Sequence, residues 1–235
     1  AIRQKDLEGN VAGKNISVPV YFVEHEHHFF RYGYYGDGSQ AYPDNASRFG
    51  FFSKAVLQIC RSLDWEPDIF HSNDWHTALI PFYLKQAQLE TNDFKNSRSV
   101  LTIHNAGYQG GAPGTFRHSL GIPLENFVLE MFEDHGHLNL LKGGINFADQ
   151  VNTVSPGYAE EMRTPLGSHG LHETYLRKGK NFSGILNGCD YDEWNPETDP
   201  YLPANFSAKN LAGKKQCKQE LQRLFGLPES SSVPL

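Results

Sequence analysis

The sequence predicts an α/β fold, with helices flanking a parallel β-sheet, and two observations lead to this prediction. Short segments rich in β-branched and aromatic residues alternate with longer segments in which apolar residues recur every three or four positions. This alternation is typical of parallel sheets. The chain has 235 residues, of which 39% are hydrophobic, enough to build the core of one large domain or two small ones. A globally disordered chain is therefore excluded.

Strands and helices are expected to alternate from the first part of the chain onward. Pro19 favours an edge position for the first predicted strand, because proline cannot donate a backbone hydrogen bond to a neighbouring strand. Pro67 follows the first predicted helix and opens the next unit. In chain order we expect a strand at residues 16–23, a polar loop rich in histidine and glycine to about residue 44, a helix at 47–63, a short buried strand at 68–71, a helix capped by residues 72–74, and a strand at 99–104.

The second part of the chain continues the same alternation. Ser155 followed by Pro156 is typical of a helix start, with serine as the cap and proline in the first turn. In chain order we expect a glycine-rich loop at residues 105–126, a helix at 138–147, a strand at 150–154, a helix from Ser155, a helix at 171–178, a strand at 182–186, an irregular segment at 192–205 and a charged amphipathic helix at 207–225. Residues 233–235 resemble the beginning of a further strand.

Composition and absent motifs exclude several classes of function. The 21 Lys and Arg residues are outnumbered by 27 Asp and Glu residues, giving a net charge of -6, so nucleic acid is not an expected partner. No run of eighteen apolar residues and no obvious export leader occurs, so no membrane partner is expected either. Three widely separated cysteines favour reduced thiols in the cytoplasm. The absence of G-x-G-x-x-G, G-x-x-x-x-G-K-[ST] and G-x-S-x-G motifs argues against dinucleotide oxidoreductases, Walker-type hydrolases and common serine hydrolases.

Three polar segments each follow a predicted strand, at residues 71–76, 104–111 and 187–190. In an open parallel sheet, ligands bind beyond the carboxyl ends of the strands, where loops converge. We therefore expect the three segments to meet in one site. His104 is the most informative residue, because a histidine at a strand end, followed by glycines, can bond hydroxyls or transfer protons. Taken alone, this interpretation and that of a histidine satisfied in the core are equally favoured.

Other polar motifs leave alternatives open. His71, Asp74 and His76 could bind a metal, but their His-x-x-Asp-x-His spacing fits a metallohydrolase loop poorly, and helix capping or substrate contact is favoured. The His-Glu-His-His run at residues 25–28 is better explained as a solvated loop than as a metal site. Lys142-Gly143-Gly144 resembles part of a phosphate-binding loop but lies in a helical pattern, which favours packing through small residues.

Taken together and in order, these segments resemble the starch and glycogen synthases that use ADP-glucose. The resemblance includes Asn73-Asp74-Trp75-His76 and His104-Asn105-Ala106-Gly107. An ordered set of blocks over almost the whole chain is more specific than any single block. The matching blocks are residues 67–76, 102–110, 141–149, 151–159, 170–171, 184–190 and 194–199.

The resemblance implies the GT-B fold, in which two Rossmann-like lobes enclose a deep cleft, with this chain as the N-terminal lobe. It also implies an enzyme that transfers glucose from ADP-glucose to the non-reducing end of an α-1,4-glucan, with retention of the anomeric configuration. ADP-glucose and the glucan are then the expected substrates. No catalytic metal and no cofactor are implied.

Roles for individual residues follow from the same resemblance. His104 is expected to bond a hydroxyl of the donor glucose, beside Asn105, and Asp74 is expected to be the second catalytic residue. Asp74 and Asn187 would orient the sugar, while glycines permit close approach of the backbone between residues 107 and 110. Further substrate contacts are expected from Gly107, Tyr108 and Gln109, and ring faces from Trp75, Tyr42 and Tyr108.

The resemblance divides the chain into residues 1–186, a partial N-terminal Rossmann-like lobe, and residues 187–235, the crossover and the opening of the C-terminal lobe. The sequence departs from the family pattern because the Lys-x-Gly-Gly-Leu loop of the first strand is absent. In the family, the basic residues that neutralise the diphosphate belong to the second lobe. We therefore expect that lobe to complete the site as a partner, and little transferase activity from this chain alone.

Two further functions stay open at this stage. The chain could be a carbohydrate-binding or scaffolding protein derived from such a lobe. With less support, it could be a metal-dependent hydrolase that uses His25, His27, His71 and His76. The expected location is the cytoplasm, or a plastid if the source is a plant or alga.

Overall fold

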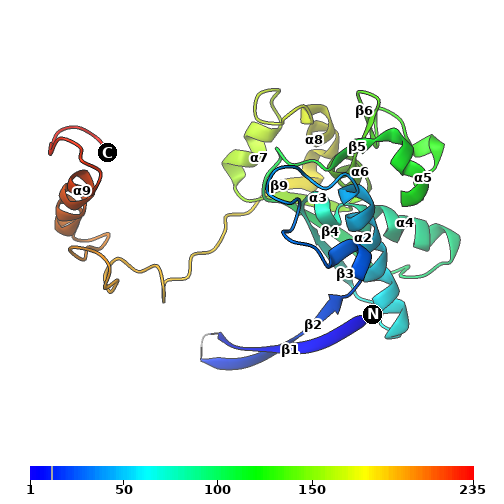
Figure 1. Cartoon of the computed structure of the whole chain (residues 1–235), viewed down its shortest axis with the longest axis horizontal. Helices are drawn as coiled ribbons and strands as arrows, with labels where there is room; N and C mark the ends of the chain where they lie inside the picture. Colours follow the sequence, from blue (N-terminus) through cyan, green and yellow to red (C-terminus); the bar gives the residue numbers. More distant parts are fainter. Residues whose placement is uncertain (12) are drawn as a thin grey trace. The chain divides into compact units, whose positions relative to one another are not determined.

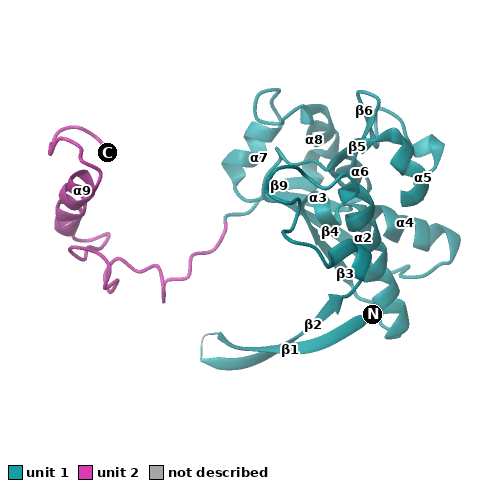
Figure 2. Ribbon diagram, viewed as in Figure 1, with its two compact units in different colours: residues 1–186 teal, residues 187–235 magenta. Residues whose placement is uncertain are grey.

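The computed structural model describes residues 1–11 and 13–235 and divides into two compact units (Figure 2). The first unit comprises residues 1–186 and the second residues 187–235. Each unit is described by itself. Within the described ranges, no helix combines the length and the apolar character needed to cross a membrane.

A four-stranded parallel sheet forms the centre of the first unit (Figure 1). Its strand order is β3-β4-β8-β9, and all three neighbouring pairs are parallel. The predicted α/β class is therefore confirmed, and the carboxyl ends of all four strands meet at one edge. The strands are β3 (Ile69–Asn73), β4 (Arg98–Ile103), β8 (Gln150–Thr153) and β9 (Phe182–Gly184).

The first strand of this sheet is less buried than the sequence predicts. Because β3 lies at the edge of the sheet, only Phe70 and Ser72 are buried, and Ile69 is 51% exposed. A run of apolar residues does not distinguish an edge strand from a central one, so the prediction of a buried strand was wrong.

Helices pack on the sheet around two apolar clusters. One cluster is centred on Phe82 and Leu84 of α4 and the other on Leu101, Ile103 and Val151 of the central strands. Helix α6 contributes to both clusters. The helices of this unit are α1 (Glu26–Phe29), α2 (Asn45–Ser62), α3 (Asp74–Thr77), α4 (Leu79–Glu90), α5 (Arg117–Leu120), α6 (Leu140–Phe147), α7 (Pro156–Met162) and α8 (His172–Lys178).

The start of α7 confirms the predicted combination of cap and proline. The Ser155 hydroxyl accepts the backbone N–H of Tyr158 at 2.8 Å, and Pro156 is the first helical residue. The cap expected before α3 differs from the prediction. Asn73 occupies the cap position without a capping hydrogen bond from its side chain.

The N-terminal hairpin is a separate two-stranded antiparallel sheet of β1 (Ile2–Val11) and β2 (Lys14–Val23) (Figure 1). Strand β2 was predicted, but β1 was not. The polar residues of β1, from Arg3 to Asp6, hide the strand pattern, because both strands are largely exposed and no buried face imposes an alternation.

The glycine-rich segment after β4 is more ordered than the predicted loop. It contains α5, 3₁₀ turns at Gly114–Phe116 and Leu124–Asn126, and strand β5 (Gly111–Pro113). Strand β5 pairs with β7 (His137–Asn139), which also pairs with β6 (Glu133–Asp134). Because β5 and β7 are distant in sequence, local patterns do not indicate that they pair. A further 3₁₀ turn, Gly179–Asn181, precedes β9.

In the second unit, helix α9 (Ala212–Leu224) follows an irregular segment, as predicted, but it begins at residue 212 and not at the predicted residue 207. Residues 233–235 form no strand, so that expectation was wrong. The chain instead turns back on α9. The Lys218 ammonium donates to the Val233 carbonyl, and the Gln222 amide donates to the carbonyls of Pro228 and Ser230.

Candidate functional site

The carboxyl ends of β3 and β4 bring His104 next to Asn73 and Asp74. The Asp74 Oδ1 atom accepts the backbone N–H of His104 at 2.8 Å. The His104 Nε2 atom lies 3.0 Å from Asn73 Oδ1. His104 itself is exposed. Two of the three predicted loops therefore meet at one rim, and the interpretation of His104 as a buried core histidine is wrong.

Asp74 reaches the end of β4 from an unusual backbone conformation. Its φ is 56°, a left-handed conformation that aspartate adopts more readily than most residues. The carboxylate is half-buried and is bonded to the His104 backbone. Asp74 therefore fixes where His104 leaves the sheet.

The loop after His104 is stabilised by its own side chains and by α7. The Asn105 Oδ1 atom accepts the backbone N–H of Gly107 at 2.9 Å, and the Ala106 N–H donates to the Tyr158 hydroxyl at 3.2 Å. Ala106 is buried, whereas Asn105 and Gly107 are exposed. The loop is thus anchored at its middle and open to solvent around it.

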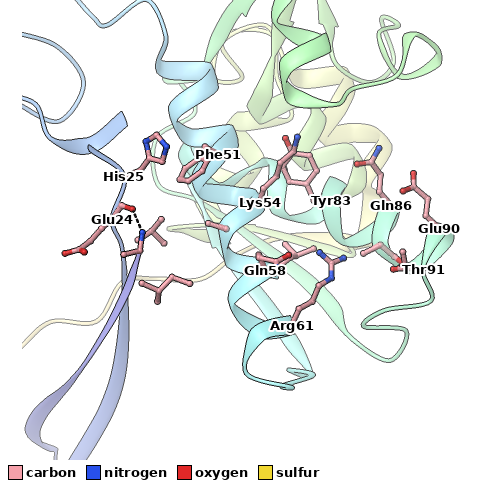
Figure 3. A pocket seen from close by; sticks show the side chains of 16 residues that line it. Glu24, His25, Phe51, Lys54, Gln58, Arg61, Tyr83, Gln86, Glu90 and Thr91 are labelled. Atoms are coloured by element: carbon pink, nitrogen blue, oxygen red, sulfur yellow. Dashed lines mark hydrogen bonds between the residues drawn. The ribbon is translucent and has the colours of Figure 1, made fainter. Parts of the chain in front are cut away.

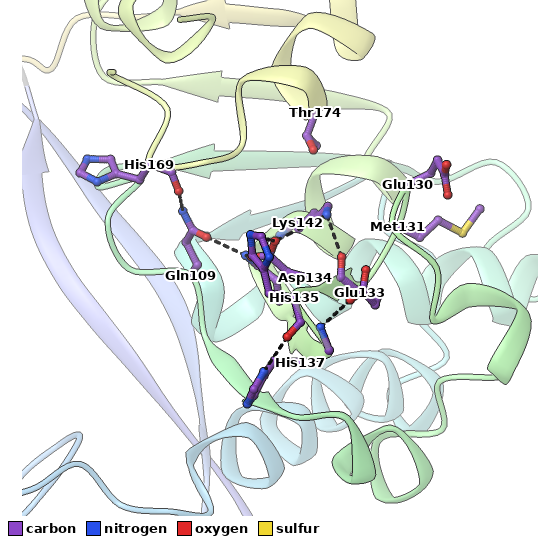
Figure 4. A network of polar contacts seen from close by, with 12 residues as sticks. Gln109, Glu130, Met131, Glu133, Asp134, His135, His137, Lys142, His169 and Thr174 are labelled. Atoms are coloured by element: carbon purple, nitrogen blue, oxygen red, sulfur yellow. Dashed lines mark hydrogen bonds and ion pairs between the residues drawn. The ribbon is translucent and has the colours of Figure 1, made fainter. Parts of the chain in front are cut away.

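Gln109 connects this loop to two distant segments (Figure 4). Its Nε2 atom donates to the carbonyls of Ala106 and His169, at 2.9 and 3.0 Å. Its Oε1 atom accepts from Asn139 Nδ2 at 2.6 Å. Asn139 is buried and also caps α6 by accepting the Lys142 N–H. These bonds hold the loop against β7 and α6.

The third predicted loop begins in the other unit, because Asn187 is the first residue of residues 187–235. Its contribution to the rim stays a prediction.

Comparisons with known proteins agree with this geometry. A family described as starch synthase catalytic domain matches residues 5–177. The chain belongs to the starch synthase catalytic domain family. Glycogen synthase 1 of Geobacter sulfurreducens is 44% identical over 228 residues, which are 97% of this chain and 45% of that protein. Glycogen synthase of Vibrio cholerae is 43% identical over 239 residues, which cover 100% of this chain and 47% of that protein.

A solved structure of the same family is also similar. The catalytic domain of starch synthase IV from Arabidopsis thaliana, bound to ADP and acarbose, aligns with a TM-score of 0.68 at 34% identity. The alignment covers 99% of this chain and 50% of that domain. The chain therefore spans about half the length of the synthases that it matches.

In this member of the starch synthase family, two of the three aromatic candidates are engaged in packing. A Cβ atom on Gly110 would lie 2.4 Å from the Trp75 ring, and Trp75 packs on both apolar clusters. The Tyr42 hydroxyl donates to the Tyr32 carbonyl, and the Arg31 guanidinium lies over the Tyr42 ring. Tyr108, in contrast, is 67% exposed and free to offer a ring face.

The Lys142-Gly143-Gly144 segment serves helix packing, as the sequence predicts. A Cβ atom on Gly143 would lie 1.8 Å from the Phe132 ring, and one on Gly144 would lie 2.5 Å from the Ala78 carbonyl oxygen. The Lys142 side chain is buried and its Nζ atom donates to the Glu133 carbonyl at 2.7 Å (Figure 4). Burial lowers the pKa of Lys142. Its ammonium is thus directed into the protein.

The histidines of the hydrolase hypothesis do not converge. In the part of the chain that the structure describes, the group with metal-ligand spacing is His27, His28 and Asp44, which includes neither His71 nor His76. Both Asp44 oxygens already accept from Arg31, each at 2.7 Å, and these bonds lower the pKa of Asp44. The arrangement does not favour a metal-dependent hydrolase.

Two other histidines of that hypothesis, His71 and His76, have structural neighbours. The His71 Nε2 atom lies 2.7 Å from the Thr102 hydroxyl. The His76 ring packs against Tyr35 and Trp75, with ring centroids 5.0 and 4.3 Å away. Burial lowers the pKa of His76, against the opposing effect of the Asp74 charge.

A cavity of about 720 Å³ lies elsewhere, between the base of the hairpin and helices α2 and α4 (Figure 3). Lys54 and Tyr83 line it, with the Lys54 Nζ atom 5.1 Å from the centre of the Tyr83 ring. None of the residues expected to contact the donor sugar or the glucan lines this cavity. This cavity and the predicted chemistry are therefore at different places in this unit.

No individual role was predicted for three residues that shape the rim. Asn73 directly precedes Asp74 at the strand end, so its position was an available signal. His169 lies beside the loop, where a Cβ atom on Gly107 would be 3.6 Å from its ring. Asn139 reaches the loop through Gln109. Neither His169 nor Asn139 has a local pattern that indicates these contacts.

Proposed function

We propose that the rim formed by Asp74 and residues 104–110 is the donor-sugar side of a glucosyltransferase site. The reaction is transfer of glucose from ADP-glucose to the non-reducing end of an α-1,4-glucan, with retention of configuration. Membership of the starch synthase family supports this proposal, as does similarity to proteins named glycogen synthase. So does similarity to a starch synthase bound to ADP and acarbose.

The observation that carries the proposal is the exposed imidazole of His104, presented from a backbone that Asp74 holds at 2.8 Å. An exposed ring on a fixed backbone can bond a sugar hydroxyl with little loss of conformational entropy on binding. Asp74 then acts by orienting this loop and the sugar. Asn105, Gly107 and Tyr108 are exposed neighbours that can contact the same ligand.

The other proposed contacts act less directly. The side-chain amide of Gln109 forms its hydrogen bonds with other parts of the protein and so stabilises the loop. Gln109 therefore shapes the site. Trp75 packs against Gly110. The Tyr42 ring packs against the Arg31 guanidinium. Asn187 is proposed as a sugar contact from the family pattern alone. A cytoplasmic location, or a plastid one in a plant or alga, also stays a prediction.

The test is a calorimetric titration of the chain with ADP-glucose, UDP-glucose and maltoheptaose. We expect weak binding, in the millimolar range, and a loss of at least about tenfold in affinity for the His104→Ala variant. His118→Ala is the matched control, because His118 is an exposed histidine on α5 away from the rim. Equal affinities of the His104→Ala variant and the unchanged chain, or no heat with any of the three ligands, would contradict the proposal.

A further inference from the structure

Asn73 stands in the cap position of α3, yet its side chain does not cap the helix. Asparagine is among the strongest cap residues, because its side-chain oxygen normally accepts a backbone N–H of the first turn. Here the Thr77 hydroxyl bonds the Asn73 backbone instead, accepting its N–H at 2.6 Å and donating to its carbonyl at 2.7 Å. The side-chain amide of Asn73 is therefore available for another contact.

That contact is with His104, which lies 31 positions further along the chain. The distance between Asn73 Oδ1 and His104 Nε2 is 3.0 Å. An amide oxygen can only accept a hydrogen bond, so this contact requires the imidazole proton to be on Nε2. In the neutral imidazole the Nδ1 atom then carries a lone pair, and no protein atom within residues 1–11 and 13–235 bonds it.

Asn73 and Asp74 thus bond different parts of His104, the ring and the backbone. Asp74 bonds the backbone N–H of His104 and leaves its side-chain torsions free. Asn73 bonds the ring and restricts both its rotation and its tautomer. Because His104 is exposed, few packing contacts would otherwise hold the ring in one orientation.

We propose that Asn73 is a positioning residue that fixes the Nε2–H tautomer and the orientation of the His104 ring, so that Nδ1 is presented as a hydrogen-bond acceptor. The group that it would recognise is a sugar hydroxyl, and this part rests on the proposed function. The positioning itself is a property of the chain without ligand and can be measured separately.

The experiment measures the two imidazole nitrogens of His104 by nitrogen-15 NMR on the full chain, with a His104→Gln variant to assign the signals. We expect one protonated nitrogen, Nε2, and one unprotonated nitrogen, Nδ1. In Asn73→Leu, which has a similar size and no acceptor, the ratio of the two tautomers falls about fivefold and the two nitrogen shifts approach each other. In Asn73→Asp, which keeps an acceptor, the shifts stay apart.

Two further variants guard against a general loss of structure. Asn73→Ala lacks the acceptor and adds no apolar bulk, so it should reproduce the result of Asn73→Leu. Ser72→Ala removes a buried neighbour that bonds the Val100 carbonyl on the other face of β3. It should lower the stability of the fold without changing the His104 nitrogens.

The proposal is overturned if Nδ1 carries the proton in the unchanged chain, or if Asn73→Leu and Asn73→Ala leave the tautomer ratio unchanged. Addition of ADP-glucose then tests the sugar contact on its own, since a bound hydroxyl should shift Nδ1 more than Nε2. If ADP-glucose does not shift the Nδ1 signal, that result would count against the proposed function. The tautomer ratio in the unliganded chain would still decide the role of Asn73.

Discussion

Ile103 is the last residue of β4 and His104 directly follows it, but the two residues belong to different environments. Ile103 is completely buried and packs in the apolar cluster with Leu101 and Val151. His104 is exposed and is held by polar contacts to Asn73 and Asp74. The interior of the sheet therefore stabilises the fold, while the rim carries the polar groups of the proposed site. The boundary between the two lies between these adjacent residues. Substitutions on either side of this boundary should have separable effects.

The largest expected difference is between alanine substitutions at these two neighbours. Ile103→Ala should lower the free energy of unfolding by about 2–5 kcal/mol, because it removes buried methyl groups and leaves a cavity. His104→Ala should change it by less than about 0.5 kcal/mol, as is usual for an exposed residue. Urea unfolding of both variants measures the difference. Similar losses for the two variants would mean that the rim is part of the stabilising core.

Substitution of Gly110, a glycine on the rim, should have an intermediate effect on stability. A side chain at this position is disfavoured both by the backbone conformation and by the nearby Trp75 ring. Its φ is 67°, and an added Cβ atom would lie 2.4 Å from the Trp75 ring. Gly110→Ala should therefore lower the free energy of unfolding by about 2–3 kcal/mol, through backbone strain and overpacking together.

Gly136→Ala is the matched control for this substitution. Gly136 also has a positive φ, 81°, but an added Cβ atom would have nothing within 4 Å. Its cost should be about 1 kcal/mol, from the backbone alone. The difference between the two variants, measured by urea unfolding, reports the contact with Trp75. Equal costs would show that Trp75 moves freely and does not brace the rim.

The parts of this molecule that sequence predicts well are those with a local pattern. The alternation of strands and helices predicts β3, α4, β4, α6, β8 and α7, because burial on one face gives each element a regular period. The rule that ligands bind at the carboxyl ends of strands locates the loops of Asp74 and His104 from the sequence alone.

What sequence does not predict depends on contacts between distant residues. Strand β1 has little buried surface and therefore no clear period. The Asn139 contact with Gln109 and the approach of His169 to Gly107 join segments at least 30 positions apart. For Lys142, the helical pattern around it favours a packing role, and its burial and its bond to the Glu133 carbonyl agree with that role. Residue type alone does not separate a packing role from a ligand site.

The amino end of β4 shows that a polar cluster can also serve stability. The Asp149 carboxylate accepts the backbone N–H and the hydroxyl of Ser99, at 2.8 and 3.0 Å, and the Lys85 ammonium at 2.7 Å. Burial raises the pKa of Asp149, but the hydrogen bonds from Lys85 and Ser99 outweigh this effect and the net pKa is lowered. Asp149→Asn should cost about 1–2 kcal/mol near neutral pH.

The pH dependence of that cost follows from the direction of the pKa shift. Because the folded state lowers the pKa of Asp149, the stabilisation is fully present above the ordinary aspartate pKa of about 3.9 and is lost as the pH falls through the lower folded value. Melting temperatures of the unchanged chain and Asp149→Asn should differ by a constant amount above about pH 5 and converge in acid. Asp93→Asn, which removes a more exposed partner of Arg61, should have a much smaller effect at neutral pH. A gap that widens as the pH falls would mean that the Asp149 carboxylate is not a stabilising partner of Ser99 and Lys85.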